Sequence, residues 1–203
     1  MSLPAGDRQL VQIMDAAFAE AQRRAGPHLV CRPGCTQCCH GAFRINALDA
    51  ARLRSGMQAL HGSDPERAHA IRGRAEAWIR EFARDFPGDP ESGVLAESEV
   101  ESDPLEEIAD DAACPALDPA SGCCEVYAWR PMTCRVFGPP VRMDTGALGC
   151  CELCFTTAND EEIAACEMSV PHDLEDNLLA DLADATETVV AYALLKPQTE
   201  SPG

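Results

Sequence analysis

Basic residues are scarce in this chain of 203 residues. Its 16 Lys and Arg residues stand against 34 Asp and Glu residues, so the formal net charge is −18, and Lys196 is the only lysine. A protein that binds nucleic acid needs a basic face to displace the counterions of the phosphates, so we expect no nucleic-acid partner. We also expect no membrane association, because an acidic surface is repelled by an anionic leaflet and no run of 18 apolar residues is present to span a bilayer.

The chain also lacks a secretory signal and the common catalytic motifs. Residues 1–18 hold no basic segment followed by an apolar run of signal-peptide length, so we expect a soluble, cytoplasmic protein. No Ser–His–Asp or Cys–His arrangement, glycine-rich phosphate loop or paired-carboxylate motif stands out. This absence favours a binding protein over an enzyme.

Cysteine is the residue type that the chain has in excess, with 12 in total. An even number fits a disulfide framework, but disulfides are rare in the cytoplasm and adjacent cysteines rarely bridge each other without strain. Here the cysteines form C-C pairs and C-x2-C steps, and thiolate is the soft ligand that zinc and iron–sulfur clusters select. The pattern therefore favours a metal site.

The first group of cysteines follows the pattern C-x3-C-x2-C-C. Steps of two and three residues let one loop curl around a single metal centre, and Pro33 and Gly34 supply a tight turn within it. The next residue, His40, is an additional candidate. The cysteine candidates of this group are Cys31, Cys35, Cys38 and Cys39.

Two further groups of cysteines lie toward the C-terminus. The second is interrupted by prolines, so we expect mostly turns there; its members are Cys114, Cys123, Cys124 and Cys134. The third repeats the adjacency and the two-residue step of the first, which indicates a second centre or extra ligands to a polynuclear one; its members are Cys150, Cys151 and Cys154. Cys166 stands among apolar residues of a predicted helix, where we expect a buried thiol.

The residues around the second group carry a longer motif. Cys114-Pro-Ala-Leu is followed by Cys124-Glu-Val-Tyr-Ala-Trp-Arg-Pro-Met-Thr-Cys134-Arg-Val-Phe. With the C-x3-C-x2-C-C pattern ahead of it, this string resembles the YkgJ-type cysteine-cluster family, also called the CxxCxxCC zinc- or iron-chelating domain, over residues 28–154. Cys123 and an acidic insertion before Cys114 depart from the family pattern. The resemblance implies a metal-chelating domain whose ligands are Cys31, Cys35, Cys38, Cys39, Cys114, Cys124 and Cys134, with Arg130, Pro131 and Arg135 as signature neighbours.

Two of these neighbours are arginines that flank Cys134. A centre ligated by four thiolates carries about two net negative charges. Hydrogen bonds from the guanidinium groups of Arg130 and Arg135 to thiolate sulfur would offset that charge. The alternative is that both arginines form ordinary salt bridges in an acidic protein.

The metal stays open between zinc and an iron–sulfur cluster. Adjacent cysteines fit poorly around one tetrahedral ion but suit a cluster or two bridged ions. We expect the protein to hold this metal for storage, transfer, sensing or electron transfer, with no protein partner assigned. The alternatives are an enzyme or an accessory subunit of a protein-modification system that uses the cluster for redox chemistry, and a purely structural zinc domain.

Helical periodicity dominates the remaining sequence. A capping box at Asn159–Glu162 predicts a short helix, and the basic-free stretch from Asp85 to Trp129 predicts an acidic loop over 87–113 with one helical turn near 104–112. Longer helices are predicted over residues 7–24, 46–60, 65–86 and 172–194.

These elements predict a mainly α fold. We expect a small helical domain organised around cysteine-rich metal-binding loops, with little regular β structure. It would form a single domain over residues 1–203, with its metal-binding core at about 28–154 and its C-terminal helices at about 159–194.

Overall fold

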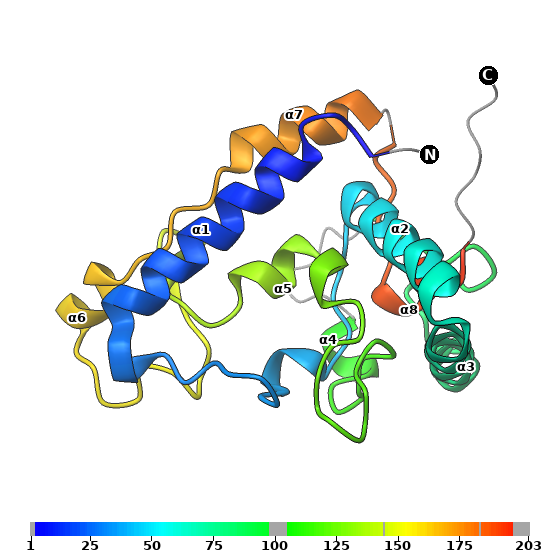
Figure 1. Cartoon of the computed structure of the whole chain (residues 1–203), viewed down its shortest axis with the longest axis horizontal. Coiled ribbons are helices and arrows are strands. Elements are labelled where there is room, and N and C mark those ends of the chain that lie inside the picture. The colour runs from blue at the N-terminus through cyan, green and yellow to red at the C-terminus, as the bar shows by residue number, and fades with distance from the viewer. Residues whose placement is uncertain (1–2, 98–104, 144, 183, 197–203) are drawn as a thin grey trace. The chain divides into compact units, whose positions relative to one another are not determined.

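The computed structural model describes residues 3–97, 105–143, 145–182 and 184–196, and its chain divides into two compact units (Figure 1). The first unit comprises Met1–Leu3, Gly34–Pro131 and Leu179–Gly203, and the second comprises Pro4–Pro33 and Met132–Leu178. The C-x3-C-x2-C-C pattern is therefore divided between the units, with its first cysteine in the second unit and the other three in the first. The expectation of a single domain stays a prediction.

Three helices hold the core of the first unit: α2 (Ala47–Ser63), α3 (Pro65–Phe82) and α8 (Val190–Leu195), which pack against one another. Two of them begin at side-chain caps, since the Asn46 side chain accepts a hydrogen bond from Asp49 N at 2.9 Å and the Asp64 side chain accepts one from Arg67 N at 3.1 Å. Such caps satisfy backbone N–H groups that have no partner within the helix. The buried residues between the helices include Leu53, Met57, Ile71, Ala193 and Leu194.

The predicted acidic loop is partly structured. Within it lie two short antiparallel strands, β1 (Gly88–Asp89) and β2 (Val94–Leu95), and the helix α4 (Leu105–Ile108) near the predicted helical turn. Its few apolar residues anchor it, because Leu95 and Leu105 are buried in one cluster with Trp78, Phe86 and Tyr192. The predicted helix over 65–86 is wrong at its end, since α3 stops at Phe82. Residues 98–104 of the predicted loop lie outside the described residues.

The long helix α1 (Asp7–Ala25) packs on α5 (Met132–Val136) in the second unit. A second antiparallel pair follows, β3 (Val141–Arg142) with β4 (Leu148–Gly149). The predicted capping box is confirmed at the start of α6 (Asp160–Ala165): the Asn159 side chain accepts from Glu162 N at 3.0 Å, and the Glu162 carboxylate accepts from Asn159 N at 2.9 Å.

The predicted helix over residues 172–194 is wrong in its middle. The chain forms α7 (His172–Leu182) and then α8, with an extended segment before α8. In that segment the Asp184 carboxylate accepts from Thr186 N at 3.0 Å, and Thr188 exchanges two backbone hydrogen bonds with Ile45, at 2.9 and 3.0 Å. The local turn at Asp184 competes with helix formation, and the long-range pairing joins two β-branched residues, which favour extended backbone. Together they override the helical periodicity.

The mainly α fold is confirmed. In the part of the chain that the structure describes, the strands are those of β1–β2 and β3–β4, and all are short. Across the same residues, the helices include none with the length and apolar character needed to cross a bilayer.

Candidate metal centre

A backbone pairing brings the first and second groups of cysteines together in the first unit. Cys38 and Cys39 end a short 3-10 helix, η2 (Gln37–Cys39), and the next residues pair antiparallel with the chain before Cys114. The Cys114 N–H donates to Cys39 O at 2.7 Å, and the Gly41 N–H donates to Ala112 O at 3.0 Å. This pairing fixes Cys39 directly beside Cys114.

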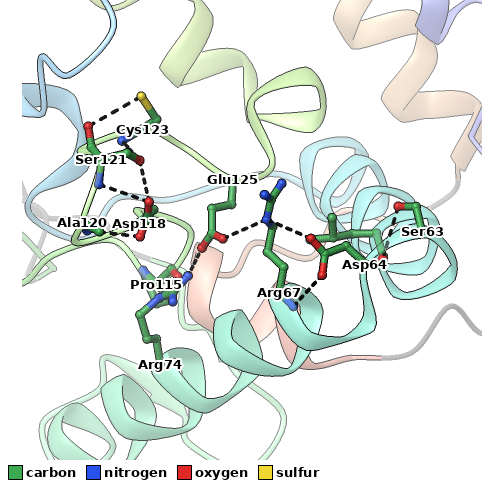
Figure 2. Close-up of polar contacts among 11 residues, drawn as sticks. Ser63, Asp64, Arg67, Arg74, Pro115, Asp118, Ala120, Ser121, Cys123 and Glu125 are labelled. Atoms are coloured by element: carbon green, nitrogen blue, oxygen red, sulfur yellow. Dashed lines mark hydrogen bonds and ion pairs between the residues drawn. The ribbon is translucent and has the colours of Figure 1, made fainter.

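The loop between Cys114 and Cys124 folds back on itself. Leu117 and Cys124 form an antiparallel bridge across it. The Asp118 carboxylate closes the tip, because it accepts hydrogen bonds from the Ser121 N–H at 3.1 Å and from the Ser121 hydroxyl at 2.5 Å (Figure 2). The fold-back returns Cys124 to the region of Cys114.

Arg74 of α3 holds both ends of this loop (Figure 2). Its Nε donates to Pro115 O at 2.8 Å, and its guanidinium pairs with the Glu125 carboxylate. Since Pro115 follows Cys114 and Glu125 follows Cys124 in the chain, one side chain braces the backbone beside two candidate ligands. No local sequence pattern points to Arg74, because the carbonyl that it binds lies 41 positions away in the chain.

A second ion pair reaches the same carboxylate. The Arg67 Nε lies 3.4 Å from Glu125 Oε1 and 3.4 Å from Asp64 Oδ2. The Arg67 side chain is 51% exposed, whereas that of Arg74 is 29% exposed. Exposed ion pairs contribute little to stability, so the bracing of the loop rests mainly on Arg74.

The thiols of Cys38 and Cys39 differ in their tendency to ionise. A hydrogen bond with the Cys39 side chain lowers the pKa of Cys38 to about 6, and the positive charge of Arg130 acts in the same direction. The same hydrogen bond raises the pKa of Cys39, and burial raises it further. The shared hydrogen bond therefore favours the thiolate form at Cys38, which is the form that binds metal.

The thiols of Cys114 and Cys124 complete this neighbourhood. Burial raises the pKa of Cys114 to about 12 and also raises the pKa of Cys124, and the charge of the Cys38 thiolate adds to both effects. Cys114 and Cys124 in turn raise the pKa of Cys39. Four sulfurs that influence one another in this way share one electrostatic environment. We call Cys38, Cys39, Cys114 and Cys124 the four-thiol set.

The two signature arginines lie in different surroundings. Arg130 is 8% exposed, and its guanidinium carbon lies 3.8 Å from the ring centroid of Tyr127, whose carbonyl accepts from Arg130 Nη1 at 2.9 Å. Its charge lowers the pKa of Cys124 as well as that of Cys38. Arg135 lies in α5 of the second unit and pairs there with Asp15 at 2.7 Å. Hydrogen bonds from both arginines to sulfur stay a prediction.

The other predicted ligands are outside the four-thiol set. Cys35 is half-buried in the first unit, and Cys123 is exposed with its sulfur 3.8 Å from Ser121 O. His40 Nδ1 lies 3.4 Å from Asp111 O. The ligand roles of these residues stay predictions, as do those of the second-unit candidates Cys31, Cys134, Cys150, Cys151 and Cys154.

The donors of the four-thiol set suit zinc or an iron–sulfur cluster. Four thiolates ligate both tetrathiolate zinc sites and cubane clusters. In the ranges that the structure describes, no three or more Cys, His, Asp or Glu side chains form a ready-made metal site. The backbone pairing sets where the ligands are attached, and rotation about each Cα–Cβ bond sets where the sulfur points.

A family model described as "CxxCxxCC: Putative zinc- or iron-chelating domain" matches residues 30–167. The chain belongs to the CxxCxxCC family. The resemblance inferred over residues 28–154 is therefore confirmed, and the match extends to include Cys166. No curated protein and no solved structure gives a significant match to the chain. Zinc and iron are the metals to consider for this CxxCxxCC protein.

Proposed function

We propose that this CxxCxxCC protein binds zinc or iron through the four-thiol set and holds the metal for storage or transfer. The observation that carries the proposal is the backbone hydrogen bond of 2.7 Å between Cys114 N and Cys39 O, which joins the first and second cysteine groups. Membership of a zinc- or iron-chelating family supports the choice of metals. Thiolate ligands suit zinc and iron–sulfur clusters better than they suit magnesium or calcium.

The residues of the site have separate tasks in this proposal. Cys38 offers a thiolate, and the other three thiols lose their protons on binding. Arg130 offsets part of the negative charge of the thiolates, and Arg74 keeps the loop between Cys114 and Cys124 in place. A bound zinc ion or cluster supplies the positive charge that keeps all four thiols deprotonated.

The partial exposure of the four cysteines favours storage or transfer over a purely structural role, for which a metal site is usually closed. All four cysteines are half-buried. A half-buried site supports exchange of the metal with an acceptor better than a fully closed one would. We further propose that the protein is cytoplasmic and that it does not bind nucleic acid. The net charge of −18 supports the second of these points.

Anaerobic purification followed by metal analysis, sulfide analysis and an absorption spectrum tests the proposal. A colourless protein with stoichiometric zinc supports a zinc site. A brown protein with equal amounts of iron and acid-labile sulfide supports an iron–sulfur cluster. A purified protein that contains neither metal, and takes up neither when reduced and supplied with them, contradicts the proposal.

A pair of serine variants tests the ligand set. Serine is close in size to cysteine but is a poor ligand for zinc and iron, so Cys114→Ser should lower the bound metal substantially. Ala120→Ser is the matched control, because it adds a hydroxyl at an exposed position of the same loop and removes no thiol. Equal metal content in wild type and Cys114→Ser would rule out the four-thiol set.

A further inference from the structure

The second unit buries cysteines that the proposed function does not use. Cys151, Cys154 and Cys166 are 7%, 4% and 6% exposed and belong to one buried cluster, against which Cys31 packs. With Cys31, the four cysteines come from three segments: the chain after α1, the loop after β4 and the end of α6. A buried cysteine often acts as a small hydrophobic residue. Four thiols gathered from three segments are also the arrangement of a tetrathiolate metal site.

The turn that carries Cys151 and Cys154 ends in a strained backbone conformation. The Cys154 N–H donates to Cys151 O at 2.8 Å, and the next residue, Phe155, has a φ of 56°, the one positive φ of a non-glycine residue in the part of the chain described. Phe155 is held there because its N–H donates to His28 O at 2.8 Å and its ring stacks on the His28 ring. Strain that is fixed by its surroundings in this way collects at functional sites.

Gly138 lies against both Cys31 and Cys151. A Cβ added to Gly138 would lie 2.8 Å from Cys31 Sγ, and its φ of 121° strongly favours glycine. Its carbonyl accepts from the Cys151 N–H at 3.2 Å. The backbone at Gly138 therefore links the two cysteine segments and puts no side chain beside the Cys31 sulfur.

We propose that Cys31, Cys151, Cys154 and Cys166 form a second metal site, of the closed tetrathiolate kind that takes zinc. None of these cysteines belongs to the four-thiol set, so the inference goes beyond the proposed function. Zinc accepts four thiolates in a tetrahedron and imposes no other geometry. The described residues form no ready-made site, so the proposal requires that the thiols take other staggered rotamers on this backbone to converge on the ion.

The surroundings of these four cysteines assign the site a structural role. Apolar residues pack around the thiols, including Phe18, Leu29 and Phe155, as is usual for a site that holds the fold together. Arg24 of α1 already donates to the carbonyls of Ala165 at 3.1 Å and Glu167 at 2.8 Å, on either side of Cys166. A zinc ion would join the segment of Cys166 to the segments of Cys31 and of Cys151 and Cys154. Removal of the zinc should therefore loosen all three segments together.

Zinc analysis of the full chain tests the site. The variants are Cys154→Ser and Cys166→Ser, and the matched control is Thr156→Ser, at an exposed position two residues after Cys154. After reduction, saturation with zinc and gel filtration, each of the two variants should hold about one zinc ion per chain less than wild type, and the control should match wild type. Unchanged zinc content in both variants overturns the inference.

Cobalt titration separates this site from the four-thiol set. The double variant Cys114→Ser/Cys124→Ser should still give the intense absorption of tetrahedral thiolate cobalt, and adding Cys166→Ser should abolish it. If the wild type binds cobalt and the folded double variant does not, the second site is refuted while the proposed function stands. If the double variant binds as much cobalt as wild type and Cys166→Ser lowers it, the proposed function fails while the second site stands.

A measurement on the wild type needs no variant to fold. Alkylation of the zinc-loaded chain, read peptide by peptide in a mass spectrometer, should leave the four second-unit cysteines protected. A zinc chelator should make all four reactive at a common rate. Cysteines that react at the same rates with and without the chelator contradict the site, as does a disulfide between any two of them in anaerobically prepared protein.

Discussion

At the scale of single residues, Arg74 connects the helical core to the backbone beside two candidate ligands. Its side chain is 29% exposed and that of its partner Glu125 is 13% exposed, so the pair is only partly screened by solvent. A planar guanidinium can bond Pro115 O and the Glu125 carboxylate at the same time, which an ammonium group on a flexible stem does less well. The order of the loop therefore depends on this side chain.

Replacing Arg74 by Ala should weaken both the fold and the metal site. The change leaves the Glu125 carboxylate with the looser Arg67 contact at 3.4 Å, so we expect a loss of about 1 kcal/mol of unfolding free energy, measured by urea denaturation. Metal affinity, measured by competition with a chelator, should fall because the loop is less ordered before binding. Arg74→Lys should give values between those of wild type and Arg74→Ala.

The control for this prediction is Arg67→Ala, which removes only longer and more exposed contacts. We expect it to change the unfolding free energy by less than about 0.5 kcal/mol and to leave metal affinity near that of wild type. An Arg74→Ala chain that is destabilised but binds metal as tightly as wild type would show that Arg74 stabilises the fold without positioning the ligands.

The unequal thiols predict how many protons metal binding releases at the four-thiol set. The hydrogen bond between the two thiols lowers the pKa of Cys38 to about 6 and raises that of Cys39, and burial raises the pKa values of Cys114 and Cys124. Near pH 7.5 we therefore expect one ionised thiol and three protonated thiols in the set. Because each protonated thiol must lose its proton to bind, metal affinity should rise with pH, with about three protons released per metal-bound set. The rise should steepen below about pH 6, where Cys38 is protonated too.

Calorimetric titration in buffers of different ionisation enthalpy measures this number. The experiment is best done with Cys154→Ser/Cys166→Ser present, so that only the first unit contributes to the signal. Release of about four protons at neutral pH would mean that the Cys38 thiol is not ionised before binding, and the proposed role of its hydrogen bond with Cys39 would then be wrong.

At the scale of elements, α2 lies unusually close to the 3-10 helix η3 (Tyr127–Trp129), which precedes Arg130. Gly56 of α2 makes this approach possible, since a Cβ there would lie 2.6 Å from Trp129 Cγ. The clashing atoms are at the base of the indole ring, where the side chain cannot simply swing away. The contact therefore fixes the position of η3 on the helical core.

Gly56→Ala should be destabilising despite the better helix propensity of alanine. Overpacking against Trp129 costs about 1–3 kcal/mol, which exceeds the gain of about 1 kcal/mol from replacing a helical glycine. The matched control is Gly73→Ala in α3, where an added Cβ meets nothing within 4 Å, and which should be stabilising. Thermal unfolding measures both, and equal midpoints for the two variants would contradict the close packing.

How far the elements follow from the sequence depends on where their hydrogen bonds go. The starts of α2 and α6 were predictable, because Asn46 and Asn159 cap them within the same turn. The interruption before α8 was not, because it depends on Thr188 pairing with Ile45, far away in the sequence. The candidate site divides in the same way: spacing reveals the cysteines, whereas Arg74 becomes visible only once α3 is packed.

At the scale of the whole molecule, closeness along the chain does not decide which cysteines share an environment. Cys31 and Cys35 belong to one sequence pattern, yet they fall in different compact units. Cys39 and Cys114 are distant in sequence and are joined by a backbone hydrogen bond. Twelve cysteines can therefore serve more than one centre, and none of them is a buried member of the helical core of the first unit.

The composition of this core predicts what metal removal does to the first unit. The buried cluster between α2, α3 and α8 contains Leu53, Met57, Ile71 and Leu194 and no buried cysteine, although Cys114 and Cys124 pack against it. Each such apolar side chain contributes about 1.5–3 kcal/mol through burial, so the helices should stay folded without metal. Chelation under reducing conditions should therefore leave the far-ultraviolet circular dichroism of the helices largely unchanged.

Hydrogen exchange should then separate the loops from the core. Without metal, the amides of residues 37–41 and 112–125 should exchange faster, because they lie in loops rather than in long helices, while those of α2 and α3 should keep their protection. The comparison is best read within one sample, so that the core amides serve as the internal control for the loop amides. If the core loses protection together with the loops, metal binding and folding of the first unit are one process, and a storage protein that survives the loss of its metal is the wrong description.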